Sequence, residues 1–203
     1  MTPDSARDDL AFLRALVDPP GTGFQRRFGE TYAWCGACYG TQMVLHGLQY
    51  LGLVDGALAG LLIGLGPTVV FVSALPFILR RHRASPGASA ISRAVGAVFS
   101  AVGVANLVLV VAIGSLAWRE RSLTIWLLYP TTVVILQGAA WMVVYALRRR
   151  LWLAAVAIGW FATGIGMALA IKSFGALIPI AGFGFFAFMC APGLFLMRQN
   201  RGA

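Results

Sequence analysis

The stretch GALAGLLIGLGPTVVFVSALPFIL, residues 56–79, contains no Asp, Glu, Lys or Arg. A hydrocarbon core about 30 Å thick is crossed by about 20 residues of helix. Because lipid offers no hydrogen-bond partners, a spanning segment must satisfy its own backbone, as a helix does. Charge-free runs of similar length recur along the chain. They predict six spans, at about residues 31–54, 56–79, 94–118, 122–147, 151–171 and 173–197.

The composition of the chain is that of a membrane protein. Only 11% of its 203 residues are charged and 59% are hydrophobic, whereas a soluble domain carries about 25% charged residues. The predicted fold class is therefore all-α, a six-span transmembrane helical bundle with a short N-terminal amphipathic helix. Residues 1–30 are expected to form a cytoplasmic amphipathic helix and linker, and residues 31–203 the transmembrane domain.

The N-terminal segment is charged and has helical spacing. Ser5 can cap a helix, leucines follow at helical spacing after it, and Pro19-Pro20-Gly21 ends the pattern. The segment DDLAFLRAL, residues 8–16, ahead of an all-helical membrane region, resembles small bacterial polytopic inner-membrane proteins, a group without an assigned activity. The resemblance implies a location in the membrane and no particular chemistry.

The arginines predict the orientation of the bundle. Six spans put both termini on one side, and that side carries thirteen of the sixteen Lys and Arg residues. The positive-inside rule then predicts cytoplasmic termini in a bacterial inner membrane. The net charge of +9 is explained in this way, so no nucleic acid partner is expected. The expected partners are the bilayer and anionic lipid head groups at the cytoplasmic face, with a second copy or another membrane protein as alternatives.

The motif Trp34-Cys35-Gly36-Ala37-Cys38 differs by one residue from the thioredoxin-type WCGPC. With Cys190, which lies at a similar depth, these cysteines are also weak candidates for a soft-metal site. The pair lies on a predicted transmembrane helix near its cytoplasmic end, where thiols stay reduced. We therefore favour cysteine as a small apolar packing residue.

Small residues recur at four-residue spacing along the second predicted span. Gly56, Gly60 and Gly64 form a GxxxGxxxG series. Such a series lets two membrane helices approach at backbone distance. We expect these glycines to mark a helix–helix contact, either within the bundle or between two copies of the chain.

No enzymatic activity is predicted, although the sequence leaves the question open. The chain has no H-E-x-x-H or G-x-S-x-G motif and no acidic residue well inside any predicted span. No cofactor is expected. The favoured function is a non-enzymatic integral membrane protein that binds or passes a small neutral or lipidic ligand, or that accompanies other membrane proteins. The alternative is a membrane redox or metal-binding protein that uses Cys35, Cys38 and His46.

Polar side chains from different spans lie at a similar depth. Gln42, Asn106, Gln137 and Thr163 are all near the middle of their spans, and His46 is one turn further along the first. Polar groups inside a membrane are expected to face protein or water rather than lipid. These five residues are therefore the candidate lining of a central ligand-binding cavity. The alternative is scattered interhelical hydrogen bonding, each bond stabilising by roughly 0.6 kcal/mol.

The orientation can be checked by labelling single cysteines introduced into a variant whose native cysteines are replaced by alanine. We expect Arg81→Cys and Arg149→Cys to react with an impermeant maleimide only from the cytoplasmic side. Arg119→Cys should react from outside, because it belongs to the arginine-poor side. The opposite labelling pattern would reverse the topology.

Overall fold

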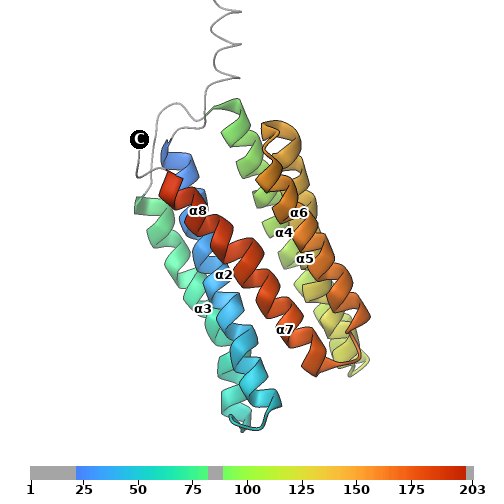
Figure 1. Ribbon diagram of the computed structural model, residues 1–203. Coiled ribbons are helices and arrows are strands. Elements are labelled where there is room, and N and C mark those ends of the chain that lie inside the picture. Colours follow the sequence, from blue (N-terminus) through green and yellow to red (C-terminus); the bar gives the residue numbers. More distant parts are fainter. Residues whose placement is uncertain (1–21, 82–88, 200–203) are drawn as a thin grey trace, which may run out of the picture.

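The computed structural model describes residues 22–81 and 89–199, and these residues form a bundle of helices joined by short turns (Figure 1). The all-α prediction is confirmed. Residues 1–21, which include most of the predicted amphipathic helix, lie outside the described residues. The helices are α2 (Thr22–Tyr50), α3 (Ala57–Arg81), α4 (Ala90–Arg119), α5 (Leu123–Arg148), α6 (Leu151–Leu169), α7 (Phe174–Phe185) and α8 (Ala191–Gln199), with a π-helical turn η1 (Phe186–Cys190) between the last two.

Five helical segments are long and apolar enough to cross a membrane: α3, α4, α5, α6 and the continuous run from α7 through η1 to α8. The prediction of membrane-spanning helices is therefore supported for five of the six proposed spans. The remaining span, predicted at residues 31–54, lies in α2 as far as Tyr50 and continues into a turn at residues 51–54, and α2 is more polar than the other long helices. It begins at Thr22 and ends at Tyr50, so residues 22–30, predicted as linker, are helical.

The polarity of α2 follows from its place in the bundle. It packs against α3 on one side and against α7, η1 and α8 on another, and few of its side chains are exposed. By contrast, α3 and α4 each have one main packing neighbour, α2 and α5 respectively, and their outward faces are rich in exposed Leu and Val. A helix that is largely enclosed by protein needs less apolar surface than one facing lipid.

The helices run alternately up and down, so the bundle has two chemically different ends. The basic end holds the start of α2, the end of α8 and the turn between α5 and α6, and nine of the described arginines lie there. The far end holds the turns at residues 51–56, 120–122 and 170–173, with Arg119, Arg121 and Lys172. Which end faces the cytoplasm remains the prediction of the positive-inside rule.

Aromatic side chains join the two halves of the bundle near the basic end. Phe28 and Tyr32 of α2 meet Phe99 of α4 and Trp141 of α5. The ring centroids of Phe28 and Phe99 are 4.7 Å apart, and those of Tyr32 and Trp141 are 5.3 Å apart. We call these four residues the aromatic junction. Edge-to-face packing of this kind stabilises beyond simple area burial.

The contact between α2 and the last helical segment is made at backbone distance. A Cβ added at Gly36 would lie 2.8 Å from the Cα of Cys190, and one at Gly29 would lie 2.8 Å from the carbonyl oxygen of Gly193. Gly36 belongs to the WCGAC motif, and its partner Cys190 closes the π-helical turn. The small residues of this motif therefore act as a packing surface for the last helix.

The glycine series of α3 plays a different part from the one predicted. An added Cβ at Gly64 would meet nothing within 4 Å, and one at Gly60 would only touch the side chain of Gln49 at 3.5 Å. Gly56 has a φ of +106° and ends the turn before α3. The expected close contact within this chain is therefore wrong for α3, and the close approach occurs on α2 instead.

These contacts predict opposite effects for two Gly→Ala substitutions in neighbouring helices. Gly36→Ala should lower stability by about 1–3 kcal/mol, because the methyl group forces α2 away from the Cys190 backbone. Gly64→Ala should be neutral or stabilise by about 0.5–1 kcal/mol, because alanine favours a helix over glycine and the space is open. Thermal unfolding of the two variants in detergent measures the difference. Equal melting temperatures would contradict this packing assignment.

Candidate functional site

The polar residues predicted to share a cavity form hydrogen bonds in three separate places. The Gln42 amide donates to the carbonyl oxygen of Gly64 at 2.9 Å and so ties α2 to α3. Asn106 of α4 accepts from the hydroxyl of Tyr129 of α5 at 2.7 Å. The Gln137 carbonyl oxygen accepts from the hydroxyl of Tyr32 at 3.1 Å. These bonds match the interhelical alternative, and a role for these residues in ligand binding stays a prediction.

The remaining two candidates, Thr163 and His46, form hydrogen bonds within their own helices. The Thr163 hydroxyl is buried and donates to the carbonyl oxygen of Gly159, one turn earlier on its own helix. His46 shares a 3.1 Å hydrogen bond with Gln49, and its ring lies edge-on to Phe174 of α7, with centroids 6.2 Å apart. His46 therefore contributes to the α2–α7 contact toward the far end.

The cysteines do not assemble into a metal site. Within residues 22–81 and 89–199, no three His, Cys, Asp or Glu side chains are placed to hold a metal ion, so the structure supports neither the weak metal-site candidates Cys35, Cys38 and Cys190 nor a metal site on Cys35, Cys38 and His46. All three cysteines are free thiols. Cys38 is buried, and the backbone of Cys190 packs on Gly36. These surroundings fit the packing role.

Tyr32 is the centre of a buried polar network within the aromatic junction. Its hydroxyl donates to Gln137 and accepts from the indole N–H of Trp141. Tyr32 is 5% exposed and Trp141 is 1% exposed, so water cannot replace either bond. A second indole, that of Trp160 of α6, approaches the same hydroxyl, although its N–H lacks a hydrogen-bond partner among the described residues. The two hydrogen bonds of Tyr32 join α2 to α5.

Further hydroxyl groups belong to two helical hairpins, α2–α3 and α4–α5. Thr68 of α3 donates to the hydroxyl of Tyr39 of α2 at 3.5 Å. On the other hairpin, the hydroxyl of Tyr129 of α5 donates to Asn106 of α4 at 2.7 Å. We call the space between the α2–α3 and α4–α5 hairpins the seam, with Tyr39, Thr68, Asn106 and Tyr129 at its middle depth.

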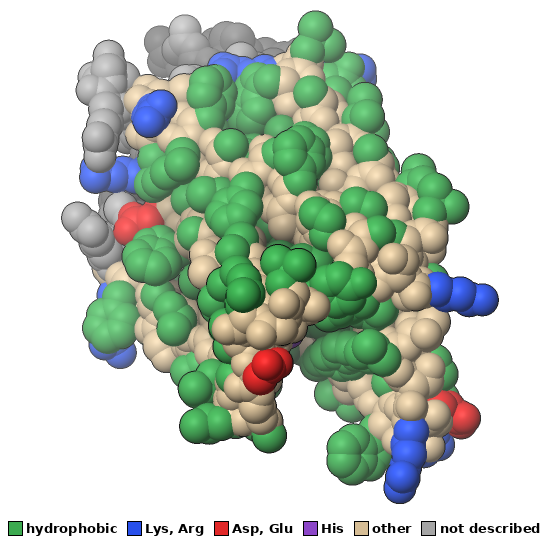
Figure 2. All heavy atoms as spheres, turned by 60° about the horizontal axis from the view of Figure 1, so that its bottom comes forward, with side chains coloured by type: hydrophobic (Ala, Val, Ile, Leu, Met, Phe, Trp, Pro, Cys, Tyr) green, Lys and Arg blue, Asp and Glu red, His purple; other side chains and the backbone are tan. Residues whose placement is uncertain are grey.

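The seam is closed at the basic end and open at the far end. The aromatic junction fills it near the basic end, and among the described residues α3 and α4 make no substantial contact with each other. Figure 2 turns the far end toward the viewer and shows two projections, one holding the α2–α3 turn and the other the α4–α5 turn, with a hollow between them. The hairpins therefore diverge toward the far end.

A groove of about 630 Å³ lies at the α4–α5 turn itself. Trp118, Arg121 and Trp126 contribute to its lining, and Trp118 is 85% exposed. Tryptophan and arginine at this position are typical of residues that sit at the boundary between hydrocarbon and water. The residues of the groove therefore support placing the far end at a membrane interface.

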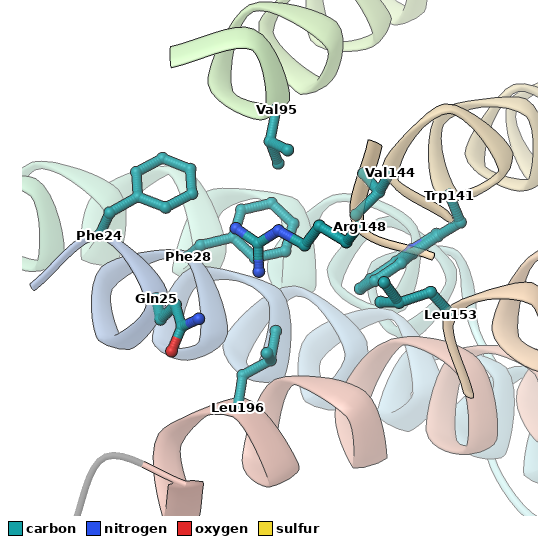
Figure 3. A pocket seen from close by; sticks show the side chains of 9 residues that line it. All are labelled: Phe24, Gln25, Phe28, Val95, Trp141, Val144, Arg148, Leu153 and Leu196. Carbon is teal, nitrogen blue, oxygen red and sulfur yellow. The ribbon is translucent and has the colours of Figure 1, made fainter. Parts of the chain in front are cut away.

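Sequence reasoning missed the tyrosines and one arginine. Tyr39 and Tyr129 count as hydrophobic in a composition analysis, although their hydroxyls were available as a signal of polarity inside a span. Arg148 was used only as a topological marker, but its side chain enters a small pocket at the basic end (Figure 3).

Comparisons with protein families, curated proteins and solved structures found no significant match.

Two Tyr→Phe substitutions compare the hydrogen bonds of Tyr32 with the hydrogen bond of Tyr129. Tyr32→Phe should destabilise the bundle by about 1–3 kcal/mol, because it leaves the buried Trp141 N–H without an acceptor. Tyr129→Phe leaves only the less buried Asn106 without its donor, so its effect should be smaller. Thermal unfolding in detergent ranks the two. A larger loss for Tyr129→Phe would mean that the Tyr32 network is not the main polar connection.

Proposed function

We propose that this chain is a non-enzymatic integral membrane protein that binds a small neutral or lipidic molecule in the seam. One observation carries the proposal, namely that two hydroxyl-bearing residues within the membrane spans of different hairpins, Tyr39 and Tyr129, form no hydrogen bond with each other. Side chains that only joined the two hairpins would be expected to bond to each other. Here each hydroxyl is instead paired with a residue of its own hairpin, Thr68 or Asn106.

The hydrogen-bonding groups of the seam favour a ligand that accepts hydrogen bonds. The Tyr39 hydroxyl accepts from Thr68, and its own proton has no acceptor among the described residues. Asn106 accepts through its carbonyl oxygen from Tyr129, which leaves its amide N–H groups to donate. A carbonyl, ester or hydroxyl oxygen would satisfy both donors. Around them, Phe71 and Phe185 provide apolar contact beside Tyr39.

The charge distribution argues for a neutral ligand. Within the described part of the chain, the acidic residues are Glu30, Asp55 and Glu120, and Asp55 and Glu120 belong to the far-end turns. Among the residues that the structure describes, no charged side chain lies at the depth of Tyr39 and Tyr129. A charged group would therefore be buried there without a counter-ion, at a cost of several kcal/mol. With the predicted orientation, the ligand would enter from the outer side or from the outer leaflet, because the seam is open at the far end.

The proposal can be tested with a photoreactive diacylglycerol, a neutral lipid that has ester and hydroxyl oxygens. We expect saturable labelling of peptides from α2 and α5, competed by unlabelled diacylglycerol. The double variant Tyr39→Phe, Tyr129→Phe should lower this labelling about five-fold, because it removes two hydroxyls from the seam. The matched control is Tyr50→Phe, whose side chain is 61% exposed at the far end and should leave labelling unchanged.

Two outcomes would contradict the seam as the binding site. One is labelling restricted to the lipid-facing sides of α3 and α4. The other is equal labelling in the double variant and the wild type. Thermal unfolding of each variant without lipid checks that reduced labelling does not come from loss of the fold.

A further inference from the structure

The basic end of the bundle contains a small pocket that is separate from the seam. It lies between the first turns of α2, the last turn of α5 and the segments of α6 and α8 that meet them (Figure 3). Phe24, Phe28 and Trp141 provide aromatic walls, and Leu196 lies on the α8 side. The cavity measures about 10 Å³, which is room for a single water-sized group.

Arg148 brings a positive charge into this pocket. It is the last residue of α5, and in Figure 3 its side chain runs across the pocket toward Phe28, with the amide of Gln25 on the same side. The Nε–H of Arg148 is shielded from solvent and has no hydrogen-bond partner among the described residues. A buried donor on a charged group is costly when it is left unpaired. The Nε–H of Arg148 therefore lacks an acceptor.

The neighbourhood supplies more positive charge and little negative charge. Nine of the described arginines lie at the basic end, and Glu30 is the one acidic residue among the described residues there. Arg150 is close enough to Arg148 for their charges to repel. No carboxylate within the described part of the chain forms an ion pair with Arg148. An anion from outside the bundle would relieve both the repulsion and the unpaired donor.

We propose that this pocket binds a phosphate oxygen of an anionic phospholipid head group. Guanidinium groups match the geometry of phosphate and are weakly hydrated, so they pair with it readily in partly buried sites. The Gln25 amide is a second donor on the pocket wall. The cavity admits one oxygen while the rest of the head group stays at the surface. A zwitterionic choline head group would bring its cation toward Arg150, which disfavours it.

The location agrees with a lipid as the source of the phosphate. Arg148 marks the end of an apolar span, Leu123–Arg148, so its guanidinium lies at the level where hydrocarbon gives way to head groups. A simpler role for Arg148 would be to interact with the negative end of the α5 dipole. That role needs no buried pocket, and Arg149 and Arg150 would fill it equally well. This inference does not depend on the ligand proposed for the seam.

The test uses the full-length protein in detergent with added dioleoylphosphatidylglycerol, dioleoylphosphatidylcholine or inorganic phosphate. Native mass spectrometry counts bound lipid, and thermal unfolding measures stabilisation. We expect phosphatidylglycerol to bind and stabilise the wild type more than phosphatidylcholine. Arg148→Gln should weaken phosphatidylglycerol binding about tenfold, because it removes a charge-assisted hydrogen bond. The control Arg26→Gln removes the same charge from an exposed position at the same end and should leave binding almost unchanged.

The remaining outcomes decide the proposal. Equal phosphatidylglycerol binding by Arg148→Gln and the wild type, or equal binding of the two lipids, would overturn it. Saturable stabilisation by inorganic phosphate without lipid would assign the pocket to a free anion and overturn the lipid assignment. If Arg148→Gln does not fold, Arg148→Lys serves in its place, because it keeps the charge and loses the planar guanidinium. Its phosphatidylglycerol binding should be weakened as well, and unchanged binding would count against the site.

Discussion

The close approach of α2 to the last helical segment is the contact on which the arrangement of the bundle depends. Gly36 and Gly29 have no side chain where the backbones of Cys190 and Gly193 pass. The π-helical turn Phe186–Cys190 lies at this contact, and an extra residue in a turn of that kind changes the direction and phase of a helix. Because α7, η1 and α8 all pack on α2, the most polar helix becomes the enclosed one. The more apolar helices α3 and α4 are left to face lipid.

The sequence was sufficient for the fold class but not for the choice of packing surface. Runs without charge predict helices and their approximate ends, since both follow from the length of chain needed to cross a bilayer. Which glycines meet a neighbouring backbone is different. Gly36 and Gly64 both occur in patterns rich in small residues, and only the position of a partner helix distinguishes them.

The polar residues Gln42, Asn106 and Gln137 show the same difference, because the sequence indicates their depth in the membrane but not the direction in which they point. Counting residues along each span placed Gln42, Asn106 and Gln137 at similar depth, but depth does not fix the rotation of a helix about its axis. In the bundle these side chains turn toward three different partners, Gly64, Tyr129 and Tyr32. Two of those partners are tyrosines, whose rings satisfy the apolar pattern while their hydroxyls form the bonds. Tyrosine is therefore the residue type that a hydropathy pattern is least able to assign to a polar site.

The Arg148 pocket and the seam are connected through the aromatic junction. Phe28 and Trp141 line the Arg148 pocket, and the same Trp141 donates to Tyr32, which in turn holds Gln137. A change in the pocket therefore acts on residues that also close the basic end of the seam. In residues 22–81 and 89–199, no comparable aromatic contact joins the hairpins at the far end, and α3 and α4 lack substantial contact. The hairpins are thus held together at the basic end, where aromatic rings from α2, α4 and α5 and a buried polar network resist separation.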